Sequence, residues 1–198
     1  IGKNMKNYKF ILASASPRRK ELLSIYVKDF KIMPADIYET IPNNIALEDA
    51  PLYIAKEKAA AVFNKINEDE IIITADTIVL LDNKIYGKPK DKLDAYNIIK
   101  TFSGKTHQVI TGVCCYSKDK QINIEFSDVT NVSFTNISDE IIEKYLKNAE
   151  YIDKAGAYAV QGLASMFVEK IEGCYDNVVG LPMGMLARNL IKYQINLF

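Results

Sequence analysis

Residues 71–81 read IIITADTIVLL, an apolar run broken by one carboxylate. The run predicts a strand, and Asp76 has apolar neighbours on both sides rather than turn residues. An ionised carboxylate in such a setting is unfavourable unless it is paired or bound to a metal, so we favour a functional carboxylate over a buried structural aspartate. Alternation places Asp76 and Thr77 on opposite faces of the strand, so both can touch one ligand only if the strand ends or kinks there.

Strand-like and helix-like segments alternate along the whole chain. This mixture predicts an α/β fold built on a mixed sheet, with residues 1–198 forming a single domain. The 198 residues fit one large domain or one two-lobed unit. We predict strands at 8–13, 30–33, 71–81, 84–86, 107–117, 121–134 and near 164–171, and helices at 16–26, 48–66, 91–102, 138–147 and 182–195.

The segment SASPRR at residues 14–19 lies where the first predicted strand passes into the first predicted helix. Free N–H groups at a helix start point toward one spot, where the helix dipole adds positive potential. The hydroxyls of Ser14 and Ser16 and the guanidinium groups of Arg18 and Arg19 lie beside it, so the segment fits a phosphate site. A capped helix with a solvated arginine pair explains the residues equally well.

Two lysines stand in places that call for an explanation. Lys58 occupies an inward-facing position on the apolar stripe of the helix predicted at 48–66. It either extends outward to solvent or reaches a buried anion. Lys88 lies in the segment GKPKD, where glycine and proline restrict the backbone and could hold the lysine toward a ligand. Most segments of this kind are ordinary turns, so GKPKD by itself is a weak indication of a site.

Composition excludes several classes of protein. The formal net charge is zero, so we expect neither nucleic acid nor a membrane as a partner. No apolar run approaches the ~18–20 residues of a membrane span, and the first ten residues lack the apolar stretch of a secretory signal. The three cysteines (Cys114, Cys115 and Cys174) are odd in number and include no Cys-x-x-Cys, which favours reduced thiols in a cytoplasmic protein.

Several catalytic motifs are absent from the sequence. There is no Walker A loop and no dinucleotide-binding glycine fingerprint. The single histidine, His107, has no second histidine with which to bind a metal. One histidine leaves a Ser-His-Asp triad open, although no nucleophile-elbow sequence accompanies it.

In combination, these segments resemble the Maf family of nucleotide pyrophosphatases. The matching stretches are ILASASPRRKELL, IAKEKAAAV, ITADTIVLLDNKIYGKPKD, FSGKTHQVITGV and DKAGAYAVQGLASMFVEKIEGCYDNVVGLPM. They span the chain from Phe10 to Met183. Each stretch is unspecific by itself, but their order and combination are highly specific.

The resemblance implies an elongated mixed α/β fold with two lobes around a deep cleft, similar to the inosine triphosphate pyrophosphatases. It implies hydrolysis of nucleoside triphosphates between the α and β phosphates, with Mg²⁺ or Mn²⁺ as cofactor. The family's proton-accepting aspartate falls on Asp76, and the metal would be shared by Asp76 and Glu39. The residues that would bind substrate are Ser14, Ser16, Arg18, Arg19, Lys58, Thr77, Lys88 and Gln161. The resemblance also brings in Asp153 and Lys154 without a firm role.

Three positions resemble the branch of the family that acts on dTTP and UTP. They are Arg18, Thr77 and Gln161. The chain departs from many relatives at Tyr38, which stands where they carry an acid before Glu39. This puts in doubt a second carboxylate ligand from that loop.

The expected function is therefore hydrolysis of dTTP and UTP, or of modified pyrimidine nucleotides, to the monophosphate and pyrophosphate. The family's association with arrest of septum formation leaves an alternative, a nucleotide-binding regulator of cell division with little turnover. A nucleotidyltransferase could use the same arginines, lysines and aspartate. By resemblance, the expected assembly is a homodimer.

Overall fold

The structure is a computed structural model that describes residues 8–119 and 121–197. Its strands are β1 (Lys9–Leu12), β2 (Phe30–Ile32), β3 (Glu70–Leu81), β4 (Lys84–Tyr86), β5 (Thr106–Ser117), β6 (Asn123–Phe134) and β7 (Val168–Glu172). Its α-helices are α1 (Pro17–Tyr26), α2 (Ala50–Phe63), α3 (Lys92–Phe102), α4 (Asp139–Tyr145), α5 (Tyr175–Val179) and α6 (Met183–Ile191). Short 3₁₀ helices are η1 (Leu47–Asp49), η2 (Leu146–Asn148), η3 (Ala155–Ala157) and η4 (Leu163–Phe167).

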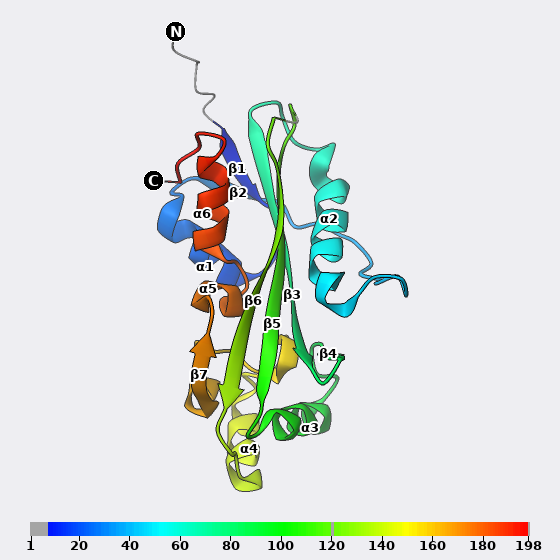
Figure 1. Cartoon of the computed structure of the whole chain (residues 1–198), viewed down its shortest axis with the longest axis vertical. Helices are drawn as coiled ribbons and strands as arrows, with labels where there is room; N and C mark the ends of the chain where they lie inside the picture. The colour runs from blue at the N-terminus through cyan, green and yellow to red at the C-terminus, as the bar shows by residue number, and fades with distance from the viewer. Residues whose placement is uncertain (1–7, 120, 198) are drawn as a thin grey trace.

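The strands form one seven-stranded sheet in the order β2-β1-β3-β5-β6-β7, with β4 also paired to β3. β1 runs parallel to β2 and to β3, and the other pairings are antiparallel. The predicted mixed α/β fold is therefore confirmed. The long strands β3, β5 and β6 run the length of an elongated molecule (Figure 1).

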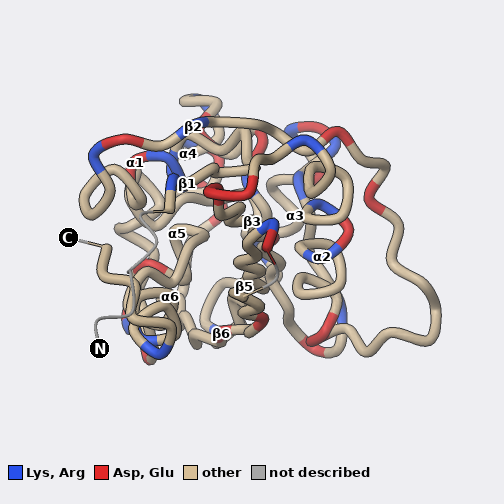
Figure 2. Tube along the Cα trace, turned by 90° about the horizontal axis from the view of Figure 1, so that it is seen from above, with Lys and Arg blue, Asp and Glu red and all other residues tan. Residues whose placement is uncertain are grey.

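Helices cover both faces of the sheet. Seen from above, α2 lies on one side of the long strands and α1, α5 and α6 lie on the other (Figure 2). The alternation of β3 explains this arrangement, because Ile71 and Ile73 join the larger core on one face while Ile72 joins the smaller core under α2. Each face of β3 thus has an apolar layer to bury.

Helix α2 approaches the sheet closely at Gly112 of β5. A Cβ atom added there would lie within 2.5 Å of backbone atoms of Pro51 and Leu52, in the first turn of α2. Gly112 is paired with Asp76 on β3. The missing side chain therefore lets α2 rest on the sheet beside Asp76.

The observed elements differ from the predicted ones at several points, most of them in the second half of the chain. Residues 164–167 lie in the 3₁₀ helix η4, and the strand there begins at Val168. Helix α5 was not predicted, because five residues are too few to show a helical period. Helix α2 ends at Phe63 and α6 at Ile191, short of the predicted ends at 66 and 195.

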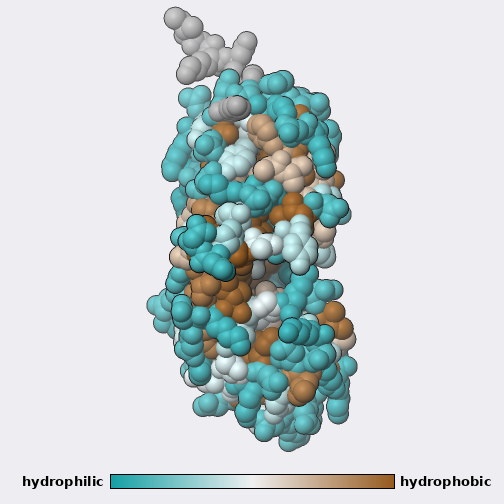
Figure 3. All heavy atoms as spheres, turned by 90° about the vertical axis from the view of Figure 1, so that its right-hand side faces the viewer, coloured by the Kyte–Doolittle hydropathy of each residue, from teal (hydrophilic) through white to brown (hydrophobic). Residues whose placement is uncertain are grey.

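No helix in the described part of the chain is both long and apolar enough to cross a membrane. Cys114 and Cys115 are buried free thiols, and Cys174 is a half-buried free thiol. Viewed from the side of α2, the surface is mostly polar, with smaller apolar areas near its middle (Figure 3).

Candidate active site

The SASPRR segment forms the predicted turn between β1 and α1. Ser16 caps the helix, since its side chain accepts a hydrogen bond from the Arg19 amide at 3.5 Å, and Pro17 begins the helix. The amide of Ser16 donates in turn to Ser14 Oγ at 3.2 Å. The helix start and both hydroxyls therefore line one side of a cavity of about 890 Å³.

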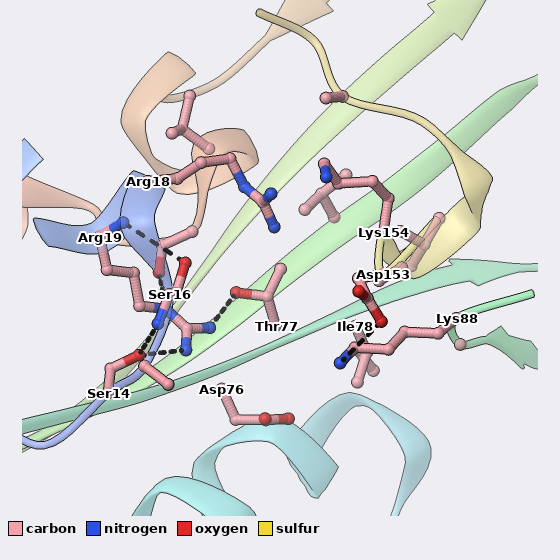
Figure 4. A pocket seen from close by; sticks show the side chains of 18 of the residues that line it. Ser14, Ser16, Arg18, Arg19, Asp76, Thr77, Ile78, Lys88, Asp153 and Lys154 are labelled. Carbon is pink, nitrogen blue, oxygen red and sulfur yellow. Dashed lines mark hydrogen bonds and ion pairs between the residues drawn. The ribbon is translucent and has the colours of Figure 1, made fainter. Parts of the chain in front are cut away.

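Arg19 turns back from α1 into this cavity and is held by three hydrogen bonds. Its Nε donates to the Gly180 carbonyl at 2.8 Å, one terminal nitrogen to Ser14 Oγ at 3.3 Å, and the other to Thr77 Oγ1 at 2.9 Å (Figure 4). All three acceptors are uncharged. Burial lowers the pKa of Arg19, and the negative charge of Asp76 acts in the opposite direction. A fixed guanidinium that donates to neutral acceptors is suited to an incoming anion.

Asp76 and Glu39 share the ammonium group of Lys58. Lys58 Nζ lies 2.7 Å from Asp76 Oδ1 and 2.8 Å from Glu39 Oε1. The inward-facing lysine on α2 therefore reaches a buried anion, as one of the two expectations had it. Burial raises the pKa of Asp76 above its ordinary value, and this effect outweighs the opposing influence of Lys58 and Arg19.

Asp76 and Thr77 line the same cavity although they point to opposite faces of β3. The strand neither ends nor kinks at this point. On this edge of β3, the pairing with β1 stops at Ile73 and the pairing with β4 starts at Val79. The described residues supply no strand partner to the stretch between them on that edge. A ligand at the gap can therefore reach both faces of β3.

Positive groups also lie on the other walls of the cavity. Arg18 reaches in from α1, and Lys154 reaches in from the segment before η3 (Figure 4). Burial is the main cause of the lowered pKa of each, and Arg18 lowers that of Lys154 further. Lys88 lies 3.9 Å from Asp153, an exposed and therefore weak ion pair. The cavity thus combines cations on several walls with the Asp76–Glu39 pair on one and Asp153 beside Lys88 on another.

Gln161 lies at the exposed rim of the cavity. Its loop is anchored by Glu150, whose two carboxylate oxygens accept from the Leu163 amide at 3.0 and 2.9 Å. The side chain of Gln161 is therefore presented to the cavity mouth from a tethered loop.

The structure brings every sequence-predicted site residue to this one cavity. They are Ser14, Ser16, Arg18, Arg19, Glu39, Lys58, Asp76, Thr77, Lys88 and Gln161. Tyr38 is 94% exposed and is not among the lining residues, so the loop offers Glu39 alone. Sequence reasoning missed Gly180, whose carbonyl holds Arg19 from 161 positions away. No local pattern in the sequence indicates that contact.

The residues fit a divalent cation only in part. Glu39 and Asp76 are oxygen donors of the kind that Mg²⁺ and Mn²⁺ prefer. Among the described residues, no group of three or more histidine, cysteine, aspartate or glutamate side chains could hold a metal ion. Mg²⁺ commonly binds one or two carboxylates and completes its shell with water and substrate phosphates. The pair therefore fits an ion that arrives with a phosphate ligand.

His107 takes no part in this site. It is buried among Phe102, Phe134 and Tyr158, and its Nε2 lies 2.7 Å from Tyr158 Oη. Burial lowers its pKa to about 4, so the ring is neutral at pH 7. Neither ring nitrogen has a serine or aspartate partner among the described residues, so His107 is not part of a Ser-His-Asp triad.

The family pattern described as "Maf-like protein" matches residues 9–193. The chain belongs to the Maf family. A "dTTP/UTP pyrophosphatase" of Clostridium beijerinckii is 47% identical over 187 residues, covering 94% of this chain and 100% of that protein. One from Phocaeicola vulgatus, with the same name, is 49% identical over 192 residues and covers 96% and 98%.

A solved structure named nucleoside-triphosphatase / dITP/XTP pyrophosphatase, from Mycobacterium abscessus, is also similar. It aligns with a TM-score of 0.40 and 13% identity over 65% of this chain and 75% of that chain. The two Maf relatives cover 94% and 96% of this chain.

Proposed function

We propose that this Maf protein hydrolyses dTTP and UTP, or modified pyrimidine triphosphates, to the monophosphate and pyrophosphate. The observation that carries the proposal is the meeting, in one cavity, of the fixed Arg19 guanidinium with the Asp76–Glu39 pair. The guanidinium can bind the triphosphate, and the carboxylate pair can activate water. The relatives named dTTP/UTP pyrophosphatase support the choice of substrate.

In the proposed reaction, the phosphates lie against the start of α1, Arg18, Arg19, Lys88 and Lys154. Water attacks the α phosphorus, the bond to the bridging oxygen breaks, and pyrophosphate leaves with the bonding electrons. Cations fixed before the reaction stabilise the charge that develops on this leaving group. Asp76 accepts the proton of the attacking water, for which a raised pKa is favourable.

We propose that Glu39 and Asp76 would hold a divalent ion, Mg²⁺ or Mn²⁺, that enters with the nucleotide. Such an ion supplies positive charge beside the phosphates and lowers the pKa of bound water. The ammonium of Lys58, which now joins the two carboxylates, would then be free to contact phosphate oxygens.

Base selection is assigned to the residues at the cavity mouth. Gln161 offers both a donor and an acceptor, which suits a ring with two carbonyls and one N–H. A polar site rejects a base that leaves its groups unpaired. We therefore propose that Gln161 and Arg18 favour thymine and uracil over purines. Thr77, which was expected to act with them, has its hydroxyl bound to Arg19 and Thr111.

The test is a screen of pyrophosphate release from dTTP, UTP, dCTP and GTP at fixed Mg²⁺, with and without EDTA. Turnover of dTTP and UTP well above GTP, abolished by EDTA, would support the proposal. Tight binding of dTTP without release would instead favour the regulator. Release that depends on an added acceptor would favour a nucleotidyltransferase.

We also propose that the protein works in the cytoplasm as a homodimer. The free thiols of the cysteines support the cytoplasm. The family resemblance supports the homodimer. Sedimentation equilibrium of the full chain would test the assembly.

A further inference from the structure

Arg19 is the first member of a chain of hydrogen bonds that runs from the cavity into the core. Its terminal nitrogen donates to Thr77 Oγ1, which lies 2.9 Å from Thr111 Oγ1. Thr111 Oγ1 donates in turn to the backbone carbonyl of Asn177 at 3.0 Å. Thr111 and Asn177 are fully buried, and neither lines the cavity.

The protons in this chain can be assigned because its ends are fixed. A guanidinium only donates, so Thr77 Oγ1 accepts from Arg19. A carbonyl only accepts, so the single hydroxyl proton of Thr111 goes to Asn177. The proton between the two threonines must then belong to Thr77. Each hydroxyl therefore has one orientation, which makes this network directional rather than a set of interchangeable contacts.

Helix α5 anchors the far end of the chain. The side-chain amide of Asn177 donates to the Val109 carbonyl at 3.0 Å and to Thr130 Oγ1 at 2.9 Å, which ties α5 to β5 and β6. The residue after α5 is Gly180, whose carbonyl accepts from Arg19 Nε. Helix α5 and the residue after it thus place two groups that orient the guanidinium. The Gly180 carbonyl binds it directly, and the Asn177 carbonyl acts on it through Thr111 and Thr77.

We infer that Thr111 and Asn177 are positioning residues that hold Arg19, through Thr77, in the orientation that binds the leaving phosphates. This inference rests on the proposed phosphate-binding role of Arg19. It also assigns Thr77 to the phosphate end of the site. Loss of the Thr111 hydroxyl should therefore weaken phosphate binding and leave the preference between bases unchanged.

Calorimetry with inorganic pyrophosphate isolates the phosphate end, because this probe carries no base. We expect Thr111→Val to weaken pyrophosphate binding about tenfold, as expected for a misdirected hydrogen bond to a charged group. Thr111→Ser, which restores the hydroxyl, should recover most of it. The ratio of kcat/KM for dTTP to that for GTP should stay within about twofold of wild type in both variants, since the base contacts are intact.

Ser117→Ala is the matched control. Ser117 lies on the same strand and face, is fully buried, and bonds to Asp119 and to the Ile122 amide. It stands six residues from Thr111, or roughly 20 Å along the strand. We expect Ser117→Ala to lower Tm without changing the affinity for pyrophosphate.

A second measurement does not depend on whether Thr111→Val folds. The chain has three arginines, Arg18, Arg19 and Arg188, so their Nε–H signals can be resolved by ¹⁵N NMR in the unmutated protein. The inference requires one strongly protected Nε–H signal, assigned to Arg19 by its loss in Arg19→Lys. This Nε–H donates to Gly180, so its protection reports how firmly the residue after α5 holds the guanidinium, and it should persist in Thr111→Ser and in Ser117→Ala.

Unchanged pyrophosphate affinity in a folded Thr111→Val, or an unprotected Arg19 Nε–H, would overturn the inference. So would a change in the ratio of dTTP to GTP turnover as large as the change in phosphate affinity. Failure of the proposed function looks different. The wild-type protein would then release no pyrophosphate from dTTP, while the effect of Thr111 on pyrophosphate binding and the Arg19 signal would remain.

Discussion

At Asp76 two opposing influences meet in one carboxyl group. Burial favours its protonated form, whereas Lys58 at 2.7 Å and nearby Arg19 favour its charged form. Burial prevails, so its pKa is raised, and the charged form needed for catalysis becomes fully populated only above that raised value. Activity that depends on Asp76 should therefore increase as the pH rises through its pKa.

Asp76→Asn should preserve the fold and lower kcat for dTTP by ~10²–10⁴, because an amide cannot take up the proton of water. Tm should not fall, since the change removes a charge from a mostly buried site. The control is Asp128→Asn, which alters a half-buried carboxyl on β6 outside the cavity, also with a raised pKa. If Asp76→Asn keeps more than about a tenth of wild-type turnover, Asp76 is not the base.

Lys58 occupies the space that any cation shared by Glu39 and Asp76 must take. Without nucleotide, we expect weak binding of Mn²⁺ by the wild-type protein. Lys58→Met should strengthen it by roughly tenfold or more, because a cation at a few ångströms repels a dication strongly. Electron paramagnetic resonance of free Mn²⁺ measures this directly.

Lys56→Met removes a cation from the same helix, where it pairs with Glu125 at 2.6 Å outside the cavity. It should leave Mn²⁺ binding unchanged. If the double variant Lys58→Met/Glu39→Gln still binds Mn²⁺ more tightly than wild type, the ion binds elsewhere and the assigned carboxylate pair is refuted.

At the scale of elements, the position of α2 depends on a glycine in another element. Because Gly112 has no side chain, the first turn of α2 packs directly against the backbone of β5. Lys58 lies on α2 and reaches the carboxylate pair from there. The neighbouring atoms are backbone, which cannot move aside as a flexible side chain can. Any side chain at Gly112 must therefore displace the helix.

Gly112→Ala should destabilise the fold by about 1–3 kcal/mol through overpacking and should lower kcat/KM for dTTP about tenfold or more through the shift of Lys58. Urea denaturation and steady-state kinetics measure the two effects. Gly184→Ala is the control, because a Cβ there lies 3.4 Å from the side chain of Arg188 and the site is helical. It should be neutral or slightly stabilising. Wild-type kinetics in Gly112→Ala would contradict the dependence of Lys58 on α2.

At the scale of the molecule, two kinds of buried polar group serve different ends of the fold. The hydroxyl chain behind Arg19 links β3, β5 and α5. His107, farther along on β5, lies in an aromatic cluster with Phe102 and Tyr158. Nδ1 of His107 has no hydrogen-bond partner among the described residues. A charged imidazole would be unfavourable there, which is why its pKa falls to about 4.

His107 should make the whole fold less stable in mild acid. The unfolded chain takes up its proton near pH 6.5, whereas the folded chain does so only near pH 4, so stability is lost as the pH falls through this window. At pH 5 the loss should be roughly 2 kcal/mol relative to pH 7. Urea denaturation at both pH values measures it. Because the chain has one histidine, His107→Phe should remove most of this loss, and an unchanged loss would exclude His107 as its source.

Local patterns in the sequence determined the elements that carry the site. Apolar periodicity indicated β3 and α2, and the serine and proline before Arg18 indicated the start of α1, because such signals act between residues a few positions apart. The carboxylate within an apolar run identified Asp76 because burial of an unpaired charge is unfavourable in any fold.

Tertiary structure alone decided how these pieces meet. Strand order left an edge of β3 open, which lets Asp76 and Thr77 line one cavity without a kink. It also placed Gly180 beside Arg19, and Thr111 behind Thr77. These contacts join residues 34 to 161 positions apart. Their formation depends on which strands become neighbours, and a period of two or 3.6 residues carries no information about that choice.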